Sequence, residues 1–350
     1  MKNLSHNKKK ITISIDAMGG DNGVGAVMAG IARSLKTSSQ IHFLVHGKKN
    51  DLQKEMCNYP EIASSCSIIS CEEVVKMDEK PSAALRSGKR SSMWSSLHSL
   101  ATHNADIALS CGNTGALMAM AMVQLRKAPG VNRPAIAVLW PSTNDRGFNI
   151  VLDAGADIKA GGDDLLQYAL MGVAYAKDGF SINSPRVGLL NVGTELYKGR
   201  TELHEASVLI EKAAQDLETF TFLGYVEGGD LPSSGVDVIV TDGFTGNIAL
   251  KTGEGTASLI KYFLKETFTQ SFMSKIGSIL ALSSLKKLNQ KIDPRNVNGG
   301  IFLGLNGIVI KSHGGADAIG VAAAINLACQ LAESGLSAKL TSQFQNKNDN

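Results

Sequence analysis

The chain has 350 residues, of which 43% are hydrophobic and 19% are charged, as in a globular protein with a sizeable core. Its formal net charge of +3 is close to balance, which argues against nucleic-acid binding, since that needs a concentrated basic surface. The five cysteines form no C-x-x-C pair, and their odd number favours free thiols in a reducing compartment. No signal peptide and no apolar run of about 18 residues is visible, so we expect a cytoplasmic protein without a transmembrane helix.

Short β-branched runs alternate with longer helical patterns along the chain. The predicted strands cover residues 11–15, 41–45, 66–70, 106–110, 135–139, 148–152, 186–190, 220–224, 237–241 and 307–311. The predicted helices cover residues 23–36, 81–102, 114–127, 163–177, 201–216, 247–267, 271–290 and 315–333. Most strands are apolar on both faces, as strands are when helices cover both sides of a sheet. The alternation predicts an α/β fold with a mainly parallel, doubly wound sheet flanked by helices.

The ends of the chain are polar and predict flexible tails. The basic stretch 1–10 forms the N-terminal tail and residues 336–350 the C-terminal one, which leaves a single α/β domain over residues 11–335. The turn-rich segment 140–150 indicates an internal boundary. A doubly wound fold can also insert one half into another.

Residues 262–291 predict a projecting helical hairpin that bends near residues 270–274. Apolar side chains crowd the bend and lysines surround them. The apolar set is Phe268, Phe272, Met273, Ile276, Ile279, Leu280 and Leu282, and the lysines are Lys275, Lys286, Lys287 and Lys291. The hairpin packs in the core or at a dimer interface, or its apolar tip contacts a membrane surface with the help of the lysines. The two interpretations are compatible if the base dimerises and the tip projects.

Several familiar chemistries lack their sequence signatures. Around the stretch "LRSGKRS", residues 85–91, Ala83 and Arg90 stand where a Walker A loop needs Gly and Ser or Thr. No G-x-G-x-x-G follows a strand, and neither G-x-S-x-G nor H-E-x-x-H occurs. A dinucleotide cofactor, a covalent nucleophile and a metal therefore have no support from the sequence.

Five polar, glycine-rich loops follow predicted strands, and most of them precede a helix. They cover residues 16–23, 110–116, 191–195, 241–247 and 311–318. In open parallel sheets, ligands bind beyond the carboxyl ends of the strands. Glycines there let a ligand approach the backbone, and helix N-termini favour anions. We expect the loops to form one cradle for phosphate, although any one of them alone is typical of a turn or a helix cap.

Nine motifs in order connect the chain to a known family. They are "IDAMGGD", "KPSAALRSGKRSSMW", "SCGNTGALMA", "NRPAIA", "LDAGAD", "LLNVGTE", "VEGGD", "VTDGFTGNIALKTGEG" and "LGLNGIVIKSHGGADA". From about residue 11 to about 333, the chain resembles the acyl-carrier-protein:phosphate acyltransferases of bacterial phospholipid synthesis. The resemblance implies attack of orthophosphate on a long-chain acyl thioester of acyl-carrier protein, with no cofactor. The products would be acyl phosphate and free carrier protein.

The same resemblance implies a fold similar to those of isocitrate and isopropylmalate dehydrogenases and of phosphotransacetylases. It also implies a homodimer, peripheral contact with the inner face of the membrane, and a membrane acyl-phosphate:glycerol-3-phosphate acyltransferase as a partner. Three positions depart from the family pattern: no proline follows Asp21, Tyr225 replaces an expected Asn, and Gly315 replaces a common Ser. Roles at positions 225 and 315 therefore do not carry over.

The predicted site requires no covalent step. Orthophosphate is already an anion at neutral pH, so it needs to be bound and oriented more than it needs a strong base. We predict that Asp242 orients a donor, that Asn247 or Asn113 donates to the developing oxyanion, and that His313 orients phosphate or protonates the departing thiolate. Lys251 or Lys311 supplies the cation. The predicted substrate-binding residues are Asp16, Gly19, Gly20, Asp21, Gly112, Asn113, Thr114, Gly115, Asn191, Gly243, Gly246, Lys251, Asn306 and Lys311.

Acyl-carrier proteins are acidic, so the basic stretch with Arg86, Lys89 and Arg90 is the expected docking surface; the alternative is a solvated helix face. Three other functions stay open at this point. They are a phosphotransacetylase-like transferase acting on acyl-coenzyme A, a dehydrogenase of the related fold, and a membrane-docked scaffold that binds the carrier without turnover.

Overall fold

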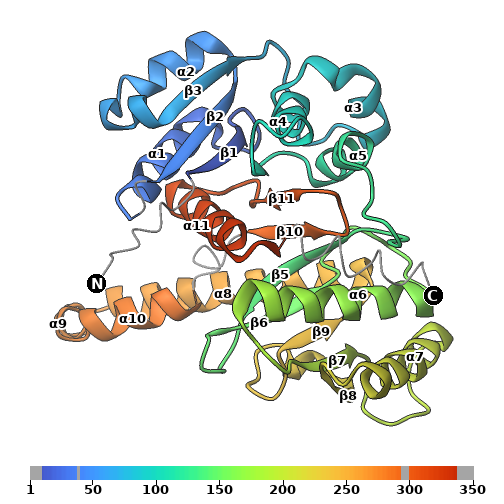
Figure 1. The fold of residues 1–350 in the computed structure, drawn as a ribbon. Helices are drawn as coiled ribbons and strands as arrows, with labels where there is room; N and C mark the ends of the chain where they lie inside the picture. The colour runs from blue at the N-terminus through green and yellow to red at the C-terminus, as the bar shows by residue number, and fades with distance from the viewer. Residues whose placement is uncertain (1–9, 38–39, 293–298, 337–350) are drawn as a thin grey trace, which may run out of the picture. The chain divides into compact units, whose positions relative to one another are not determined.

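The computed structural model describes residues 10–37, 40–292 and 299–336 (Figure 1). The chain divides into two compact units: the first combines residues 1–131 with residues 299–350, and the second covers residues 132–298. The second unit is thus an insertion in the sequence of the first. Nearly all of the two predicted tails, residues 1–9 and 337–350, lies outside the described residues, and the single domain over 11–335 stays a prediction.

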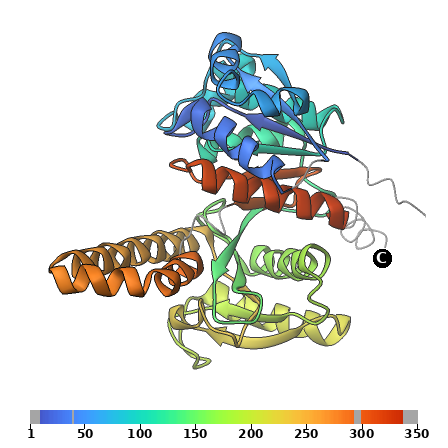
Figure 2. The same cartoon turned by 90° about the vertical axis from the view of Figure 1, so that its left-hand side faces the viewer.

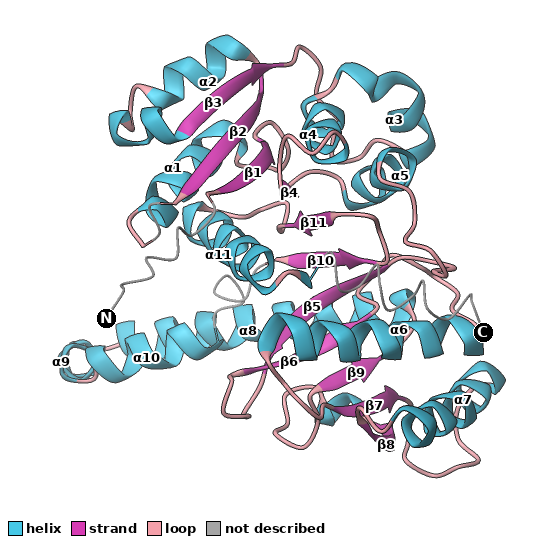
Figure 3. Ribbon diagram, in the orientation of Figure 1, coloured by secondary structure: helices cyan, strands magenta, loops and turns pink. Residues whose placement is uncertain are grey.

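The first unit is built on six described strands in the order β3-β2-β1-β4-β11-β10 (Figure 3). They are β1 (Ile11–Asp16), β2 (Ile41–Gly47), β3 (Cys66–Ser70), β4 (Ile107–Ser110), β10 (Gly300–Leu303) and β11 (Ile308–Lys311). Neighbouring strands are parallel except for the antiparallel pair β10–β11. The carboxyl ends of β1, β4 and β11 meet in register, because Ser110 pairs with both Asp16 and Lys311.

The helices of this unit pack against the sheet and against one another. They are α1 (Gly23–Leu35), α2 (Lys49–Met56), α3 (Pro81–Ser87), α4 (Ser92–Ala101), α5 (Thr114–Gln124) and α11 (Ala318–Ser334). Helices α1 and α11 are in contact, and Gly30 allows their close approach, because a Cβ there would lie 2.5 Å from Val321. Helix α4 packs against β1, where the Ser14 hydroxyl donates to the Ser96 carbonyl over 2.9 Å.

The second unit has five described strands in the order β5-β6-β9-β7-β8. They are β5 (Ala135–Pro141), β6 (Phe148–Leu152), β7 (Arg186–Leu190), β8 (Thr221–Val226) and β9 (Val238–Val240). All neighbours are parallel except the β5–β6 hairpin. The helices are α6 (Gly162–Ala174), α7 (Thr201–Leu217), α8 (Gly243–Thr269), α9 (Phe272–Leu280) and α10 (Leu282–Ile292). Part of the core consists of Val151, Leu190, Val226, Leu231, Val236 and Ile239.

The predicted α/β class is confirmed, and all ten predicted strands exist within two residues of their expected limits. Strand β10 and helix α2 were missed. The helix predicted over 81–102 is two helices, α3 and α4, because a short 3₁₀ turn at Gly88–Arg90 separates them. The segment 140–150 is not a boundary: it covers the end of β5, the turn and the start of β6.

The predicted helical hairpin is present (Figure 2). Helix α8 ends at Thr269, and the chain then turns back (Figure 2). Helix α9 contacts both α8 and α10, and residues of all three helices line a common pocket. The side chains of Phe272, Met273, Ile279 and Leu280 are 77%, 73%, 71% and 82% exposed. The side chain of Lys291 lies outside the described residues. None of the described helices combines the length and the hydropathy that crossing a membrane requires.

Candidate active site: two polar rims

Three of the five predicted loops meet at the carboxyl ends of β1, β4 and β11; we call residues 16–23, 110–116 and 311–318 the first rim. A Cβ on Gly19 would lie 2.7 Å from the backbone nitrogen of Gly112. A Cβ on Gly20, whose φ is +89°, would lie 2.7 Å from the Gly314 carbonyl. The N–H of Asp21 also donates to that carbonyl over 2.8 Å. Glycine is required here because three backbones touch.

Asp16 holds the first rim together from beneath. Its carboxylate is fully buried and accepts hydrogen bonds from the hydroxyls of Ser92 (2.6 Å) and Ser110 (2.7 Å). Burial raises the pKa of Asp16, against the lowering effect of these hydroxyls and of the backbone N–H groups of Met18 and Gly19. Asp16 therefore fixes the loops that surround it, and its carboxylate is covered by them.

Asn113 caps helix α5 and has a fully engaged side chain. Its Oδ1 accepts from the N–H of Ala116 (3.0 Å), and its Nδ2 donates to the carbonyls of Met77 (2.8 Å) and Glu79 (2.9 Å). Thr114 and the exposed Gly115 follow in the first helical turn, where backbone N–H groups have no intrahelical acceptor. At α5, the donors suited to an anion are thus the backbone amides of the first turn.

Lys311 and His313 lie on the third loop of the first rim. The ammonium of Lys311 donates to the carbonyls of Ser312 and Cys111, so it is drawn toward the backbone of the rim. His313 is exposed, and its Nδ1 accepts from the N–H of Gly315 over 3.0 Å. In the neutral ring the proton therefore belongs on Nε2. A side chain at Gly315 would make only ordinary contacts of 3.5 Å or more, so a family serine would fit there.

A second rim lies at the carboxyl ends of β6, β7 and β9, in residues 153–157, 191–200 and 241–247. Asp153 is its buried anchor: the carboxylate accepts from the backbone N–H groups of Ile136 (2.8 Å), Ala156 (2.9 Å) and Asp157 (2.7 Å). Burial raises the pKa of Asp153, although these hydrogen bonds act in the opposite direction.

The glycines at the start of α8 make room for protein groups. The N–H of Gly243 donates to the Asp157 carbonyl over 2.8 Å, and that of Gly246 donates to the Asp242 carbonyl over 2.9 Å. A Cβ at Gly243 would lie 2.6 Å from the Asp153 carboxylate, and one at Gly246 would overlap the Asp153 carbonyl. These two amides, which we expected to hold phosphate, already have acceptors within the protein.

Asp242 joins two loops of the second rim. It is buried, and its carboxylate accepts from the N–H (2.9 Å) and the hydroxyl (2.9 Å) of Thr245 at the start of α8. It also pairs with the guanidinium of Arg200. Burial alone would raise the pKa of Asp242, but the bonds from Thr245 and Arg200 outweigh it and hold that pKa below its usual value.

Two asparagines of the second rim have different surroundings. Asn191 shapes its own loop, since Nδ2 donates to the Lys198 carbonyl (2.9 Å) and Oδ1 accepts from the Val192 N–H (2.8 Å). Asn247 is exposed in the first turns of α8 beside Gly155, and its amide has no hydrogen-bond partner within the described residues. Lys251, farther along α8, pairs with Glu254 over 2.8 Å.

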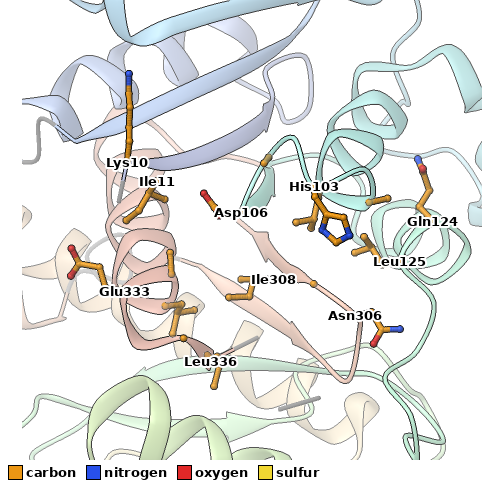
Figure 4. Close-up of a pocket in the computed structure, with 17 residues that line it drawn as sticks. Lys10, Ile11, His103, Asp106, Gln124, Leu125, Asn306, Ile308, Glu333 and Leu336 are labelled. Atoms are coloured by element: carbon orange, nitrogen blue, oxygen red, sulfur yellow. The ribbon is translucent and has the colours of Figure 1, made fainter. Parts of the chain in front are cut away.

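Asn306 lies away from the first rim. It precedes β11, at the end of the sheet where strands β1 and β4 begin. Its Nδ2 donates to the Lys127 carbonyl over 3.0 Å. It lines a cavity of about 890 Å³ together with residues that include His103, Asp106 and Glu333 (Figure 4). The structure does not bring Asn306 together with the predicted residues of the first rim, because a residue before a parallel strand lies at the opposite end of the sheet from a residue after it.

Several neighbours of the rims went unnoticed in the sequence. Ser92 and Ser110 bind Asp16, and Arg133 pairs with Asp157 over 2.6 Å. Arg200 pairs with Asp242. No spacing marks these residues, since each partner is distant along the chain.

The departure at position 225 also has a local explanation. The hydroxyl of Tyr225 contacts Nδ1 of His204 on α7 over 3.0 Å. The basic docking stretch is exposed at Arg86, Lys89 and Arg90, and Arg90 lies 3.5 Å from Glu73. No group of three His, Cys, Asp or Glu side chains in the described part of the chain is arranged to hold a metal ion.

Comparison with known proteins places this architecture in a family. The family model described as "Fatty acid synthesis protein" matches residues 11–339. A relative from Paracoccus denitrificans (strain Pd 1222), named phosphate acyltransferase, is 57% identical over 333 residues, which are 95% of this chain and 90% of the relative. The chain belongs to the phosphate acyltransferase family. A second relative with the same name, from Jannaschia sp. (strain CCS1), is 54% identical over 95% of this chain and 91% of its own. The protein is an acyltransferase of fatty-acid and phospholipid synthesis.

Solved structures show the fold in more distant proteins. A phosphotransacetylase from Streptococcus pyogenes aligns with a TM-score of 0.59 at 16% identity, covering 93% of this chain and 94% of that one. The EutD phosphotransacetylase from Staphylococcus aureus gives 0.57 at 14% identity over the same shares. A 4-hydroxythreonine-4-phosphate dehydrogenase from Klebsiella pneumoniae gives 0.53 at 13%, covering 93% and 100%. The expected likeness to phosphotransacetylases is confirmed at the level of the fold.

Proposed function

We propose that this acyltransferase transfers a long-chain fatty acyl group from the thioester of acyl-carrier protein to orthophosphate. A phosphate oxygen bonds to the carbonyl carbon, the carbon–sulfur bond breaks, and the sulfur leaves with its electron pair and takes up a proton. The products are acyl phosphate and the free thiol of the carrier. The observation that carries the proposal is the similarity, over almost the whole chain, to relatives named phosphate acyltransferase.

Each rim, taken by itself, carries groups suited to one part of this reaction. The exposed amide of Asn247 would donate to the oxyanion that develops on the carbonyl, an interaction that contributes about 3–4 kcal/mol in comparable sites. Nε2–H of His313 would donate a hydrogen bond that orients the phosphate, since Nδ1 accepts the Gly315 N–H; the departing thiolate would take its proton from the phosphate or from water. Asp242 keeps its charge at neutral pH and would orient the groups around it.

Direct attack by phosphate is favoured over an acyl-enzyme. The cysteine of the first rim, Cys111, is buried, and burial raises the pKa of its thiol. A thiol needs the thiolate form to act as a nucleophile, so Cys111 is poorly suited to that role. Phosphate brings its own negative charge and requires no such activation.

The long acyl substrate and its acidic carrier would contact further surfaces. The loop 191–200 of the second rim exposes Val192, Leu196 and Tyr197, which suit an acyl chain. Arg86, Lys89 and Arg90 would dock the carrier, through contacts that weaken as salt rises. We further propose a cytoplasmic homodimer that contacts the inner face of the membrane through the tip of the hairpin. A membrane acyl-phosphate:glycerol-3-phosphate acyltransferase would take up its product.

The test is turnover of palmitoyl-acyl-carrier protein with and without phosphate, with acyl phosphate trapped by hydroxylamine. We expect thioester cleavage only with phosphate, and a marked loss of rate in Asn247→Ala, Asp242→Ala and His313→Ala with unchanged circular dichroism. Cys111→Ser should retain activity, because no acyl-cysteine forms. Near-normal rates in the first three variants would exclude these residues from the reaction, and phosphate-independent cleavage would exclude the reaction itself.

The same assay separates the alternatives. Faster turnover of palmitoyl-coenzyme A than of the carrier thioester would instead indicate a phosphotransacetylase-like transferase. A protein that binds the carrier without any turnover would be a scaffold.

A further inference from the structure

Arg200 presents a charged guanidinium at the second rim. It is the last residue before helix α7, and its side chain is 58% exposed, whereas its partner Asp242 is 2% exposed. The carboxylate is further fixed by Thr245, through one bond from the backbone N–H and one from the hydroxyl, both 2.9 Å long. An exposed arginine is thus held on one side by a buried, anchored carboxylate.

A second arginine–aspartate pair in the same unit provides a comparison. Arg186 is the first residue of β7, so it lies at the end of the sheet opposite to the second rim. It pairs with Asp237, which is also buried. Its Nε and Nη2 bind both oxygens of Asp237 at 2.9 and 3.1 Å, and Nη2 also donates to the Ser234 carbonyl at 2.8 Å. Most of the hydrogen-bonding capacity of this guanidinium is used within the protein, as expected for a structural pair.

Arg200 uses fewer of its N–H donors within the protein than Arg186 does. Within the described residues its guanidinium has one hydrogen-bond partner, Asp242. A guanidinium has five N–H donors in a fixed plane, so four remain for a ligand at the edge of the sheet where ligands of parallel α/β folds bind. The neighbouring α8 carries the exposed amide of Asn247 in its first turns. A fixed cation and a nearby amide donor match a compact oxyanion.

We propose that Arg200 binds the orthophosphate substrate, and that Asp242 is the positioning residue that aims its guanidinium. This inference rests on the proposed function and identifies the cation that holds the acceptor. It replaces Lys251 and Lys311 in that role: Lys251 is paired with Glu254, and the ammonium of Lys311 is directed to backbone carbonyls.

The test compares Arg200→Gln with Arg186→Gln under steady-state conditions. Hydrogen bonds to charged groups are stronger than those between neutral groups, so we expect the KM for phosphate to rise about 10- to 100-fold in Arg200→Gln. The KM for the acyl thioester should stay near its wild-type value. Arg186→Gln should lower the melting temperature and leave the KM for phosphate unchanged. Guanidinium ion should restore part of the activity of Arg200→Ala, which a purely structural role would not allow.

Asp242→Asn tests the positioning step. It should also raise the KM for phosphate, and the double variant with Arg200→Gln should be little worse than Arg200→Gln alone, because both changes remove one interaction. A rise confined to the KM for the thioester would overturn the inference, as would an unchanged KM for phosphate in Arg200→Gln.

Failure of the inference is distinguishable from failure of the proposed function. Isothermal titration of the full chain with inorganic phosphate measures binding without turnover. Loss of binding in Arg200→Gln supports the inference even if the acyl donor is not the carrier thioester. Equal binding by wild type and variant overturns it even if the wild type forms acyl phosphate.

Discussion

Buried polar residues explain much of how the two rims keep their shape. Asp16 and Asp153 are inaccessible carboxylates that accept hydrogen bonds from serine hydroxyls and backbone amides, respectively. Both acids follow a strand in the sequence, and Asp16 was predicted to bind substrate. In the structure its carboxylate instead binds groups of the protein itself, namely hydroxyls of residues 76 and 94 positions away along the chain. Sequence spacing cannot show such partners.

His46 predicts a pH dependence of stability. It is buried between β2 and α4, with Nε2 2.9 Å from the Ser14 hydroxyl and Nδ1 2.9 Å from that of Ser95. Burial lowers its pKa from 6.5 to about 4. The folded chain therefore binds this proton more weakly than the unfolded chain. The stabilisation is fully present above the unfolded pKa and is lost as the pH falls through the folded one.

We expect His46 to account for a loss of about 3 kcal/mol in the free energy of unfolding between pH 7 and pH 4. Urea unfolding at intermediate pH values would measure it. His46→Gln should be less stable at pH 7 but should depend less on pH across this window. Parallel curves for wild type and variant would show that another group is responsible.

At the level of elements, the hairpin of α8, α9 and α10 leaves an apolar surface uncovered within its own unit. Phe272 and Leu280 at the two ends of α9 are the most exposed of its large apolar side chains, at 77% and 82%, and Lys275 lies between them. Apolar residues beside cations suit the interface of an anionic membrane. The sequence predicted this hairpin correctly because helical periodicity and a polar break near residue 270 are local signals.

Phe272→Asp and Leu280→Asp should therefore weaken binding to anionic vesicles. Burial of one such side chain contributes about 1.5–3 kcal/mol, so each change should lower vesicle affinity at least about tenfold. Turnover of the carrier thioester in solution should persist. Val208→Asp is the matched control, since Val208 is 70% exposed on α7. Equal vesicle binding by all three variants would argue against this surface.

For the whole molecule, a phosphate site predicts stabilisation by ligand. A ligand that binds only the folded state at a hundredfold excess over its Kd adds about 2.7 kcal/mol to the free energy of unfolding. Phosphate should thus raise the melting temperature of the wild type above that in chloride of equal ionic strength. In Arg200→Gln this increase should shrink, whereas Arg186→Gln should retain it. A shift of the same size in all three proteins would indicate a general salt effect.

The sequence by itself determined the α/β class, the positions of ten strands, the hairpin and the family. These follow from hydrophobic periodicity, turn residues and long ordered motifs, which are local properties of the chain. It also identified the polar loops at strand ends and the need for glycine within them. It missed β10 and placed Asn306 with residues of the first rim, which lie at the other end of the sheet.

Only the tertiary structure decided which polar groups remain for a ligand. The amides of Gly243 and Gly246 and the side chain of Asn113 proved to be bound within the protein. Arg200 proved to contact Asp242, 42 residues along the chain. The packing of distant segments decides which hydrogen-bond partners meet. The residue types at a site can therefore be read from the sequence, but which of their donors and acceptors remain available to a ligand cannot.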